Sequence, residues 1–523
     1  MCCHTSGTLL SMNPRVVIPL IVVALAAYFG WQQHQTCQIQ LPGVPVPANC
    51  QQAVNPPATP PVTPPSSPPV VAPQPSPPAP PPVSSNPPAT PPSTPTPPSS
   101  PTTGYPEASL NAADVNVSVN LRPERAAIFQ QYEQKNYAAA LGSAGAWLNS
   151  RPTDALMALV ENNAQQRLIG AQTVTLGLSL PTSGRNVQTG EAILQGVNLA
   201  VREANDAGGV RGRKVLIKVL NDQNDRTLAV TAASAFIADK EVLAVIGPQN
   251  SSSAVAAATI YGGGQLVSLS PVATDDRLAG FGPYIYRLFP PSSVQGRVLA
   301  KLVQKDGRVR VPLYYNPDDA FSKSLADAFE AAALPLNISV VKFEFKAGAL
   351  PDSTAFDVFS DSPTPDAAFI SGDYTDVARI AKELETRGHK VPLYGGSAAY
   401  GQEILRAGSS VDGMTMVSVF HSTANFGDIP SFVRAFQRRY GGGTPNARAM
   451  QAYDATRTLL QAIRRAPSLT REGVRAGLET FTSAKPGPGV TSKVAFSKGG
   501  IQGRPLVIIR VENGKLEARG TIQ

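Results

Sequence analysis

Cysteine is scarce in this chain of 523 residues. The four cysteines are Cys2, Cys3, Cys37 and Cys50, and residues 107–523 contain none. Cys37 and Cys50 could pair in an oxidising compartment and Cys2 and Cys3 could be acylated, but the sequence decides neither. The four histidines are isolated along the chain. No group of Cys and His therefore has the spacing of a metal site, and we expect no metal ligand.

Catalytic motifs are missing as well. The chain contains no Gly-x-Ser-x-Gly elbow, no HExxH and no P-loop. The glycine triplets at residues 262–264 and 441–443 are typical of loops or helix ends rather than of phosphate-binding loops. We therefore expect neither an enzyme nor a cofactor.

A basic stripe of the kind that binds nucleic acid is also missing. The formal net charge is +8, yet Lys and Arg are scattered and reach a density of only two adjacent residues, as in Arg438-Arg439 and Arg464-Arg465. A solvated basic surface explains this distribution better than a nucleic-acid site does. We expect no nucleic-acid partner.

Charged residues are absent from residues 42–106, which hold 27 of the fifty prolines. Such a composition buries too little apolar surface to offset the entropy lost on folding. We therefore interpret residues 32–121 as a disordered, Pro-rich tether. At about 3.1 Å per residue its Pro-rich part spans roughly 200 Å when extended.

An uncharged apolar run, residues 16–31, precedes the tether and follows Arg15. It is shorter than the roughly 20 residues of a usual membrane span. Two interpretations remain open: residues 1–31 are a cytoplasmic tip with an uncleaved membrane anchor, or the run is a signal peptide cleaved near Ala24-Leu25-Ala26. The next basic residue is Arg122, so in either case we expect the rest of the chain in the periplasm or on the extracytoplasmic face.

Residues 122–170 predict a small, separate helical unit. Helical periodicity covers residues 125–135, 137–150 and 155–168, and Thr153 or Asp154 is a candidate cap for the last helix. The pattern resembles one tetratricopeptide repeat in Phe129, Tyr132, Tyr137, Ala140, Leu141, Trp147, Leu148, Pro152, Asp154, Ala155 and Leu156. A single repeat is too short to be stable alone. It should therefore pack on the next domain, self-associate or contact a protein partner.

Short apolar runs alternate with helical segments from residue 173 to the C-terminus. The first alternating segments are residues 173–180, 190–205, 214–220, 227–238, 242–246, 251–261 and 265–269. The later ones are 309–315, 321–333, 338–345, 367–371, 374–387, 391–394 and 414–419, then helices at 429–440, 447–465 and 470–481, and short strands at 493–496, 506–511 and 515–517 with an Asn513-Gly514 turn. This alternation predicts an α/β fold with mostly parallel sheets, which bind ligands at the carboxyl ends of their strands. About 350 residues exceed one ordinary domain, so two lobes are expected.

A series of short, distinctive sequence segments occurs along this region. They are residues 181–184, Gly190, Gln195-Gly196, residues 205–212, Asn221-Asp222, residues 245–248, 251–253 and 270–274, Tyr286-Arg287 and Gln295-Gly296. The set resembles the type I periplasmic solute-binding proteins, in the branched-chain amino acid and amide receptor branch of ABC transporters. The resemblance covers residue 173 to the C-terminus.

The resemblance implies two Rossmann-like lobes joined by three hinge crossovers. Lobe 1 would comprise residues 172–291 and 419–503, and lobe 2 residues 292–418 and 504–523. A small ligand would lie in the cleft between them, and an ABC permease in the membrane would detect closure. The leading hypothesis is therefore a tethered solute receptor. The alternative is an envelope interaction protein with a degenerate cleft, such as a peptidoglycan-synthase activator, which the helical unit and tether also resemble.

Eight residues are candidates for binding a carboxylate-bearing ligand. Ser251, just after Asn250, begins a helix that directly follows a strand, and the free N–H groups of a helix start favour an anion. By resemblance, Thr274 holds the ligand's carboxylate or ammonium, Val272 offers its carbonyl group, and Tyr374 closes the cleft from the other lobe. The remaining candidates are Phe321, Asp373 and Ser397.

Several positions depart from the family pattern. Ser292 and Ser397 stand where the family has acidic residues, Phe321 where it has a cleft tyrosine, and Thr189 where it has an aromatic side chain. A buried ammonium needs an anionic partner, and Asp373 is the available substitute. The ligand is therefore expected to be a small carboxylate that need not be a standard α-amino acid.

Overall fold

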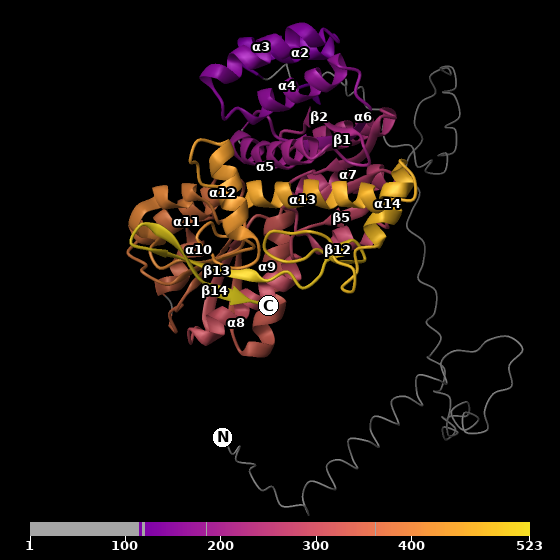
Figure 1. Cartoon of the computed structure of the whole chain (residues 1–523). Coiled ribbons are helices and arrows are strands. Elements are labelled where there is room, and N and C mark those ends of the chain that lie inside the picture. The colour runs from indigo at the N-terminus through magenta and orange to yellow at the C-terminus, as the bar shows by residue number, and fades with distance from the viewer. Residues whose placement is uncertain (1–114, 118–120, 185, 361) are drawn as a thin grey trace, which may run out of the picture. The chain divides into compact units, whose positions relative to one another are not determined.

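The computed structural model describes residues 115–117, 121–184, 186–360 and 362–523. The chain divides into residues 1–99 and 100–523, and every described residue belongs to the second part (Figure 1). The apolar run and most of the tether lie outside the described residues. Within the described ranges, no helix is both long and apolar enough to cross a membrane.

Three helices precede the first sheet: α2 (Pro123–Glu133), α3 (Tyr137–Ser150) and α4 (Ala155–Leu168). Asp154 joins all three. Its carboxylate caps α4 by accepting the N–H of Met157 at 3.1 Å, and it also accepts Arg125 Nη2 of α2 at 2.8 Å and Trp147 Nε1 of α3 at 2.9 Å. The helices therefore form one unit, and its likeness to a tetratricopeptide repeat stays a prediction.

The helical unit packs on the edge of the first sheet through α4 (Figure 1). Asn163 donates from Nδ2 to the carbonyl of Ile217 at 2.7 Å and accepts the Ile217 N–H on Oδ1 at 3.3 Å. Asn162 Nδ2 donates to the carbonyl of Val215 at 3.1 Å. These amides satisfy backbone groups that an edge strand would otherwise expose. Of the three roles expected for the unit, packing on the following domain is the one seen in the structure.

The first sheet has seven described strands in the order β11-β12-β5-β4-β3-β1-β2. Their bounds are β1 (Thr173–Leu180), β2 (Lys214–Asn221), β3 (Val242–Ile246), β4 (Val267–Ser270), β5 (Ile285–Arg287), β11 (Phe496–Ser497) and β12 (Gly500–Ile501). The helices of this lobe are α5 (Val187–Asp206), α6 (Arg226–Ala238), α7 (Ser251–Gly263), α12 (Ile429–Arg439), α13 (Ala447–Arg465) and α14 (Arg471–Glu479), with the short η4 (Asp276–Gly280). β1 to β5 are parallel, as the alternation predicts.

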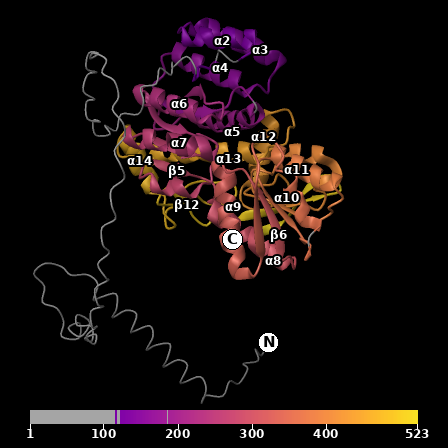
Figure 2. The ribbon, with the colours of Figure 1, turned by 180° about the vertical axis from the view of Figure 1, so that it is seen from behind.

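The second sheet also has seven described strands, in the order β14-β13-β10-β9-β8-β6-β7. Their bounds are β6 (Arg310–Tyr315), β7 (Ser339–Glu344), β8 (Ala368–Ser371), β9 (Leu393–Gly395), β10 (Thr415–Ser418), β13 (Leu506–Glu512) and β14 (Lys515–Ile522). The helices are α8 (Ser292–Lys305), α9 (Ala320–Ala333), α10 (Thr354–Asp357) and α11 (Tyr374–Thr386), with η5 (Leu334–Leu336), η6 (Val358–Ser360) and η7 (Gln402–Val411). The α/β class and the two-lobe fold are therefore confirmed. Figure 2 shows the two lobes from behind, with α8, α9 and β6 in one and α6 and α7 in the other.

The last part of the chain differs from the sequence-based expectation. The strand expected at residues 493–496 is wrong except for Phe496, and the strand expected at 515–517 extends to Ile522. β5 and β12 were not expected, because strands of two or three residues have too few positions to show a period. The Asn513-Gly514 turn is confirmed: both residues have positive φ, 52° and 67°, and β13 pairs antiparallel with β14.

The chain passes between the two sheets after β5, after β10 and after β12. Arg504 lies in the last crossing and is fully buried with Asp454 of α13, whose Oδ2 lies 2.5 Å from Arg504 Nη2. Arg504 Nη1 also donates to the carbonyl of Leu288, in the first crossing, at 3.0 Å. One guanidinium thus joins two crossings to the long helix of the first lobe.

Candidate functional site

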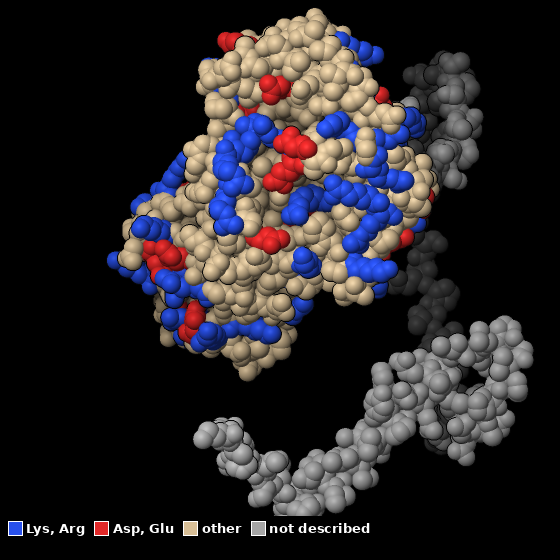
Figure 3. Space-filling model, in the orientation of Figure 1, with Lys and Arg blue, Asp and Glu red and all other residues tan. Residues whose placement is uncertain are grey.

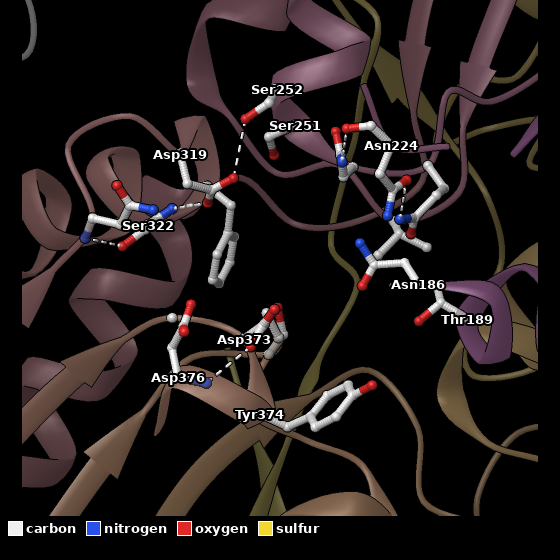
Figure 4. Close-up of a pocket in the computed structure, with 18 of the residues that line it drawn as sticks. Asn186, Thr189, Asn224, Ser251, Ser252, Asp319, Ser322, Asp373, Tyr374 and Asp376 are labelled. Carbon is white, nitrogen blue, oxygen red and sulfur yellow. Dashed lines mark hydrogen bonds between the residues drawn. The ribbon is translucent and has the colours of Figure 1, made fainter. Parts of the chain in front are cut away.

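A cleft of about 620 Å³ lies between the two sheets. Lobe 1 lines it with loops that follow its strands and with the start of α13, and lobe 2 lines it with the starts of α9 and α11 and the loop after β9. Figure 4 shows the labelled side chains of both lobes facing this space. Seven of the eight candidate residues line the cleft: Asn250, Ser251, Val272, Phe321, Asp373, Tyr374 and Ser397.

The start of α7 forms the wall of the cleft on the lobe 1 side. Asn250 caps the helix, because its Oδ1 accepts the N–H of Ser253 at 2.7 Å. Ser251 Oγ accepts the N–H groups of Thr274 and Asp275 at 3.0 and 3.3 Å, which leaves its own O–H to donate. The N–H groups of Ser251 and Ser252 lie in the first turn, where a helix supplies no acceptors. This arrangement can bind a carboxylate.

Thr274 lies behind Ser251 and does not line the cleft. Its side chain is buried, and its Oγ1 lies 2.9 Å from Ser292 Oγ. Ser292 is the position where the family has an acidic residue, so two small hydroxyl groups fill the space. In this structure, Thr274 reaches the cleft only through the backbone N–H that positions Ser251.

Lobe 2 supplies Tyr374, Asp373 and Ser397 to the opposite wall. Asp373 caps α11, with Oδ1 accepting the N–H groups of Thr375 and Asp376 at 2.8 and 3.0 Å. Burial raises the pKa of the Tyr374 phenol, so it is a neutral hydrogen-bonding group at pH 7. Ser397 is held by its N–H, which donates to Gln295 Oε1 at 3.2 Å. Asp373 therefore faces the cleft, as its role as a substitute acid requires, but one of its oxygens is already engaged by its helix.

Direct hydrogen bonds cross the cleft between the two lobes. Ser252 Oγ donates to Asp319 Oδ2 at 3.0 Å (Figure 4). The same oxygen accepts the N–H of Ala320 at 2.9 Å. Arg226 Nη2 donates to the carbonyl of Asp318. Burial raises the pKa of Asp319, and the Ser252 and Ser322 hydrogen bonds oppose this shift. The starts of α7 and α9 are thus fastened to each other.

Many residues that line the cleft were not among the candidates from the sequence, including Ser252, Asp319, Arg448 and Gln451. Ser252 was within the serine triplet that marked the helix start, and Asp319 is recognisable as a helix cap before Ser322. Arg448 and Gln451 lie three residues apart at the start of a helix whose neighbouring positions are buried and mostly apolar. That break in an apolar pattern is the signal that could have identified them.

A second hollow, of about 460 Å³, lies outside the cleft between α5, α13 and residues 486–493. Arg457, Arg464, Arg465 and Lys493 line it, and Figure 3 shows Lys and Arg gathered across the face that carries α13 and α14. Arg465 is engaged internally, since it donates to the carbonyls of Lys485 and Pro486 at 3.0 and 2.9 Å. We attribute this hollow to surface packing.

Comparisons with known proteins agree with this geometry. The periplasmic binding protein family model matches residues 173–515. The Leu/Ile/Val-binding protein BraC3 of Rhizobium johnstonii is 24% identical over 348 residues, which cover 66% of this chain and 93% of that protein. The crystal structure of the leucine binding protein LivK from Thermotoga maritima aligns with a TM-score of 0.62 at 25% identity, covering 67% of this chain and 99% of that one. An ABC transporter substrate-binding protein from Desulfitobacterium hafniense, in complex with Leu, aligns with a TM-score of 0.58 at 26% identity, covering 66% and 100%.

Proposed function

Because the chain belongs to the periplasmic binding protein family, we propose that it is a membrane-tethered extracytoplasmic receptor that captures a small carboxylate-bearing ligand for ABC-type import. The ligand occupies the cleft between the two lobes. Members of the family are solute-binding receptors, not enzymes. We infer an ABC permease as the membrane partner of this chain from its similarity to these receptors. The tether and the apolar run before it would hold the receptor at the extracytoplasmic face.

The observation that carries this proposal is the start of α7 at the wall of the cleft. The O–H of Ser251 and the first-turn N–H groups converge on the same space, and the positive end of the helix dipole favours an anion there. Tyr374 and Phe321 close the space from lobe 2. A small carboxylate fits this combination of anion-binding backbone and aromatic cover.

The ligand need not be a standard α-amino acid. Ser397 stands in the cleft where the family acid pairs with the ligand's ammonium, and Ser292 is buried against Thr274. The remaining candidate acid, Asp373, also caps its helix. An α-ammonium would therefore find a weaker partner here than the family pattern provides.

A thermal-shift screen of the full-length protein tests the proposal. The panel comprises amino acids, amides, short peptides and small organic acids. A ligand present at 100 times its Kd stabilises the folded state by about 2.7 kcal/mol, which gives a clear rise in Tm. The Ser251→Ala variant should weaken a carboxylate ligand about tenfold, because a hydrogen bond to a charged group is lost.

Ser234→Ala is the matched control, since Ser234 is an exposed serine of α6 whose Oγ donates only to the carbonyl of Val230. It should leave the ligand response unchanged. No response of the wild-type protein to any panel member would reject the receptor function and favour the alternative, an envelope interaction protein with a degenerate cleft.

A further inference from the structure

Two polar side chains of α13 line the cleft as well. Arg448 and Gln451 are three residues apart, so they lie on one face of the helix, and both line the cleft. The surrounding positions of α13 are buried and mostly apolar. A charged and a polar residue directed from such a helix into a cleft need partners there.

Arg448 has few partners inside the protein. Its Nη1 donates to the carbonyl of Tyr400 at 3.5 Å, which is a long and weak hydrogen bond. The charges of Glu403 and Asp373 act on its guanidinium, but no carboxylate in the described part of the chain forms an ion pair with it. The side chain of Arg448 is half-buried, and burial lowers its pKa. Most of its five N–H donors therefore remain available for an acceptor.

Gln451 is the second polar group of α13 with an unused hydrogen-bonding atom. It is only 1% exposed, and its Oε1 has no hydrogen-bond partner among the described residues. Leaving a buried amide oxygen without a partner costs about 1–3 kcal/mol. Rotation of the amide lets it present either its oxygen or its NH₂ group to a ligand, because the two orientations are nearly the same in shape. Gln451 can therefore complement a group held by Arg448.

Most of the carboxylates that line the cleft are engaged by other groups of the protein. Asp225, Asp319 and Asp373 each cap a helix and accept N–H groups of its first turn. The helix dipoles offset part of their charge. Asp376 pairs with Arg379 at 2.9 Å. Arg226 also lines the cleft and donates to the carbonyl of Asp318. Arg448 makes one long hydrogen bond and no ion pair within the described residues, so its guanidinium retains free donors on the α13 side.

We propose that Arg448 and Gln451 form a second oxyanion subsite, so that the ligand is a dicarboxylate or an amino acid with an acidic side chain. One carboxylate binds at the start of α7 and the other at Arg448, within a cleft of about 620 Å³. This inference rests on the receptor function proposed above and specifies its ligand class. The apolar side chains of leucine, isoleucine and valine would leave both polar groups of α13 unpaired.

Matched pairs of small acids test the subsite by titration calorimetry on the full-length protein. Glutarate is compared with valerate, and L-glutamate with L-norvaline, since each pair differs by one carboxylate on the same number of carbons. We expect the member with two carboxylates to bind at least ten times more tightly in at least one pair. In Arg448→Leu its affinity should fall roughly 100-fold, because one partner of a buried charge pair is removed.

Two further variants separate recognition from stability. Arg448→Lys keeps the charge but loses the fork of N–H donors. It should therefore fold and bind the ligand with two carboxylates roughly tenfold more weakly. Arg464→Leu removes an exposed arginine of the same helix and should change nothing in binding. Unfolding temperatures without ligand show whether each variant is folded.

The outcomes distinguish the two proposals. The subsite is supported if the protein prefers the ligand with two carboxylates, Arg448→Leu removes this preference and Arg464→Leu retains it. Binding of valerate, norvaline or leucine at least as tight as that of glutarate and glutamate keeps the receptor function and overturns the subsite. No binding of any small acid or amino acid overturns both.

Discussion

The two lobes have the same strand order but different edges. β2 and β7 occupy equivalent edge positions of the two sheets. β2 is largely buried because α4 covers it and Asn162 and Asn163 bond its backbone. β7 is partly exposed, with Val341 54% accessible, and Lys342 forms ion pairs with Asp327 and Glu330 on its surface. The unpaired edge of each sheet is thus protected in a different way: α4 covers β2 in lobe 1, and charged side chains line β7 in lobe 2.

This difference indicates how the lobes contribute to capture. Lobe 1, with the helical unit fastened to its edge, provides the start of α7 and the start of α13, and so both proposed subsites. Lobe 2 provides the covering residues Phe321 and Tyr374. If the lobes close on a ligand by hinge motion, the helical unit should move with lobe 1. The following predictions test this comparison from the largest effect to the smallest.

Asp454→Ala should be the most destabilising of these substitutions, because it removes the buried contact that joins the lobes. Both Asp454 and Arg504 side chains are fully buried, and the alanine variant leaves the Arg504 charge without a partner. The expected loss in the free energy of unfolding is about 3–5 kcal/mol. Chemical denaturation measures it. Recovery of most of the loss in the double variant Asp454→Leu, Arg504→Met would show that the unpaired charge was the cause, whereas no recovery would contradict that explanation.

Asp222 should give lobe 1 a pH-dependent stability. Complete burial raises its pKa to about 6, against the hydrogen bonds from Asn224 and Ser179. The unfolded chain releases this proton near pH 4 and the folded protein near pH 6, so the free energy of unfolding falls by about 3 kcal/mol as pH rises through this interval. The Asp222→Asn variant should lose this part of the fall. Equal pH dependence of wild type and variant between pH 4 and 7 would contradict the assignment.

Asn163→Ala should loosen the covered edge of lobe 1. The variant loses both hydrogen bonds to Ile217, one of 2.7 Å and one of 3.3 Å, and leaves buried backbone groups unpaired. The expected destabilisation is about 1–3 kcal/mol. Denaturation gives this value, and hydrogen exchange should become faster at the Ile217 amide. Unchanged exchange there would mean that α4 does not protect the edge.

Lys342→Ala is the matched change at the exposed edge of lobe 2 and should have the smallest effect. Its ion pairs with Asp327 and Glu330, at 2.8 and 3.0 Å, lie near the surface. Pairs of this kind contribute about 0–1 kcal/mol, and salt reduces the contribution further. A loss as large as that of Asn163→Ala would show that the two edges are equally dependent on their contacts.

The sequence predicted most of the fold because the longer elements have strong periods. Residues 242–246 and 447–465 were expected as the strand and helix that the structure contains, and the Asn513-Gly514 turn follows from the positive φ that both residues adopt. β5, β11 and β12 were missed or misplaced because they exist through pairing with neighbours rather than through any local pattern.

The candidate site was predictable only in part. The start of α7 could be located from a strand that leads directly into a serine-rich helix. Arg448 and Gln451 stand out in the sequence as polar positions, but the sequence does not place them in the cleft, because α13 reaches the cleft only through its tertiary packing against α5, far away in sequence. Thr274 shows the opposite case, since its position in the motif did not reveal that Ser251 would stand between it and the cleft. Which of these residues bind a ligand stays a prediction.

The most direct test of the account is a crystal structure of the full-length protein with the panel acid that gives the largest rise in Tm. The account predicts the ligand between the lobes, with one carboxylate accepting hydrogen bonds from Ser251 Oγ and the first turn of α7. A ligand with a second carboxylate should also contact Arg448 through that group. Density for the ligand only in the hollow between α5 and α13, with an empty cleft, would contradict it.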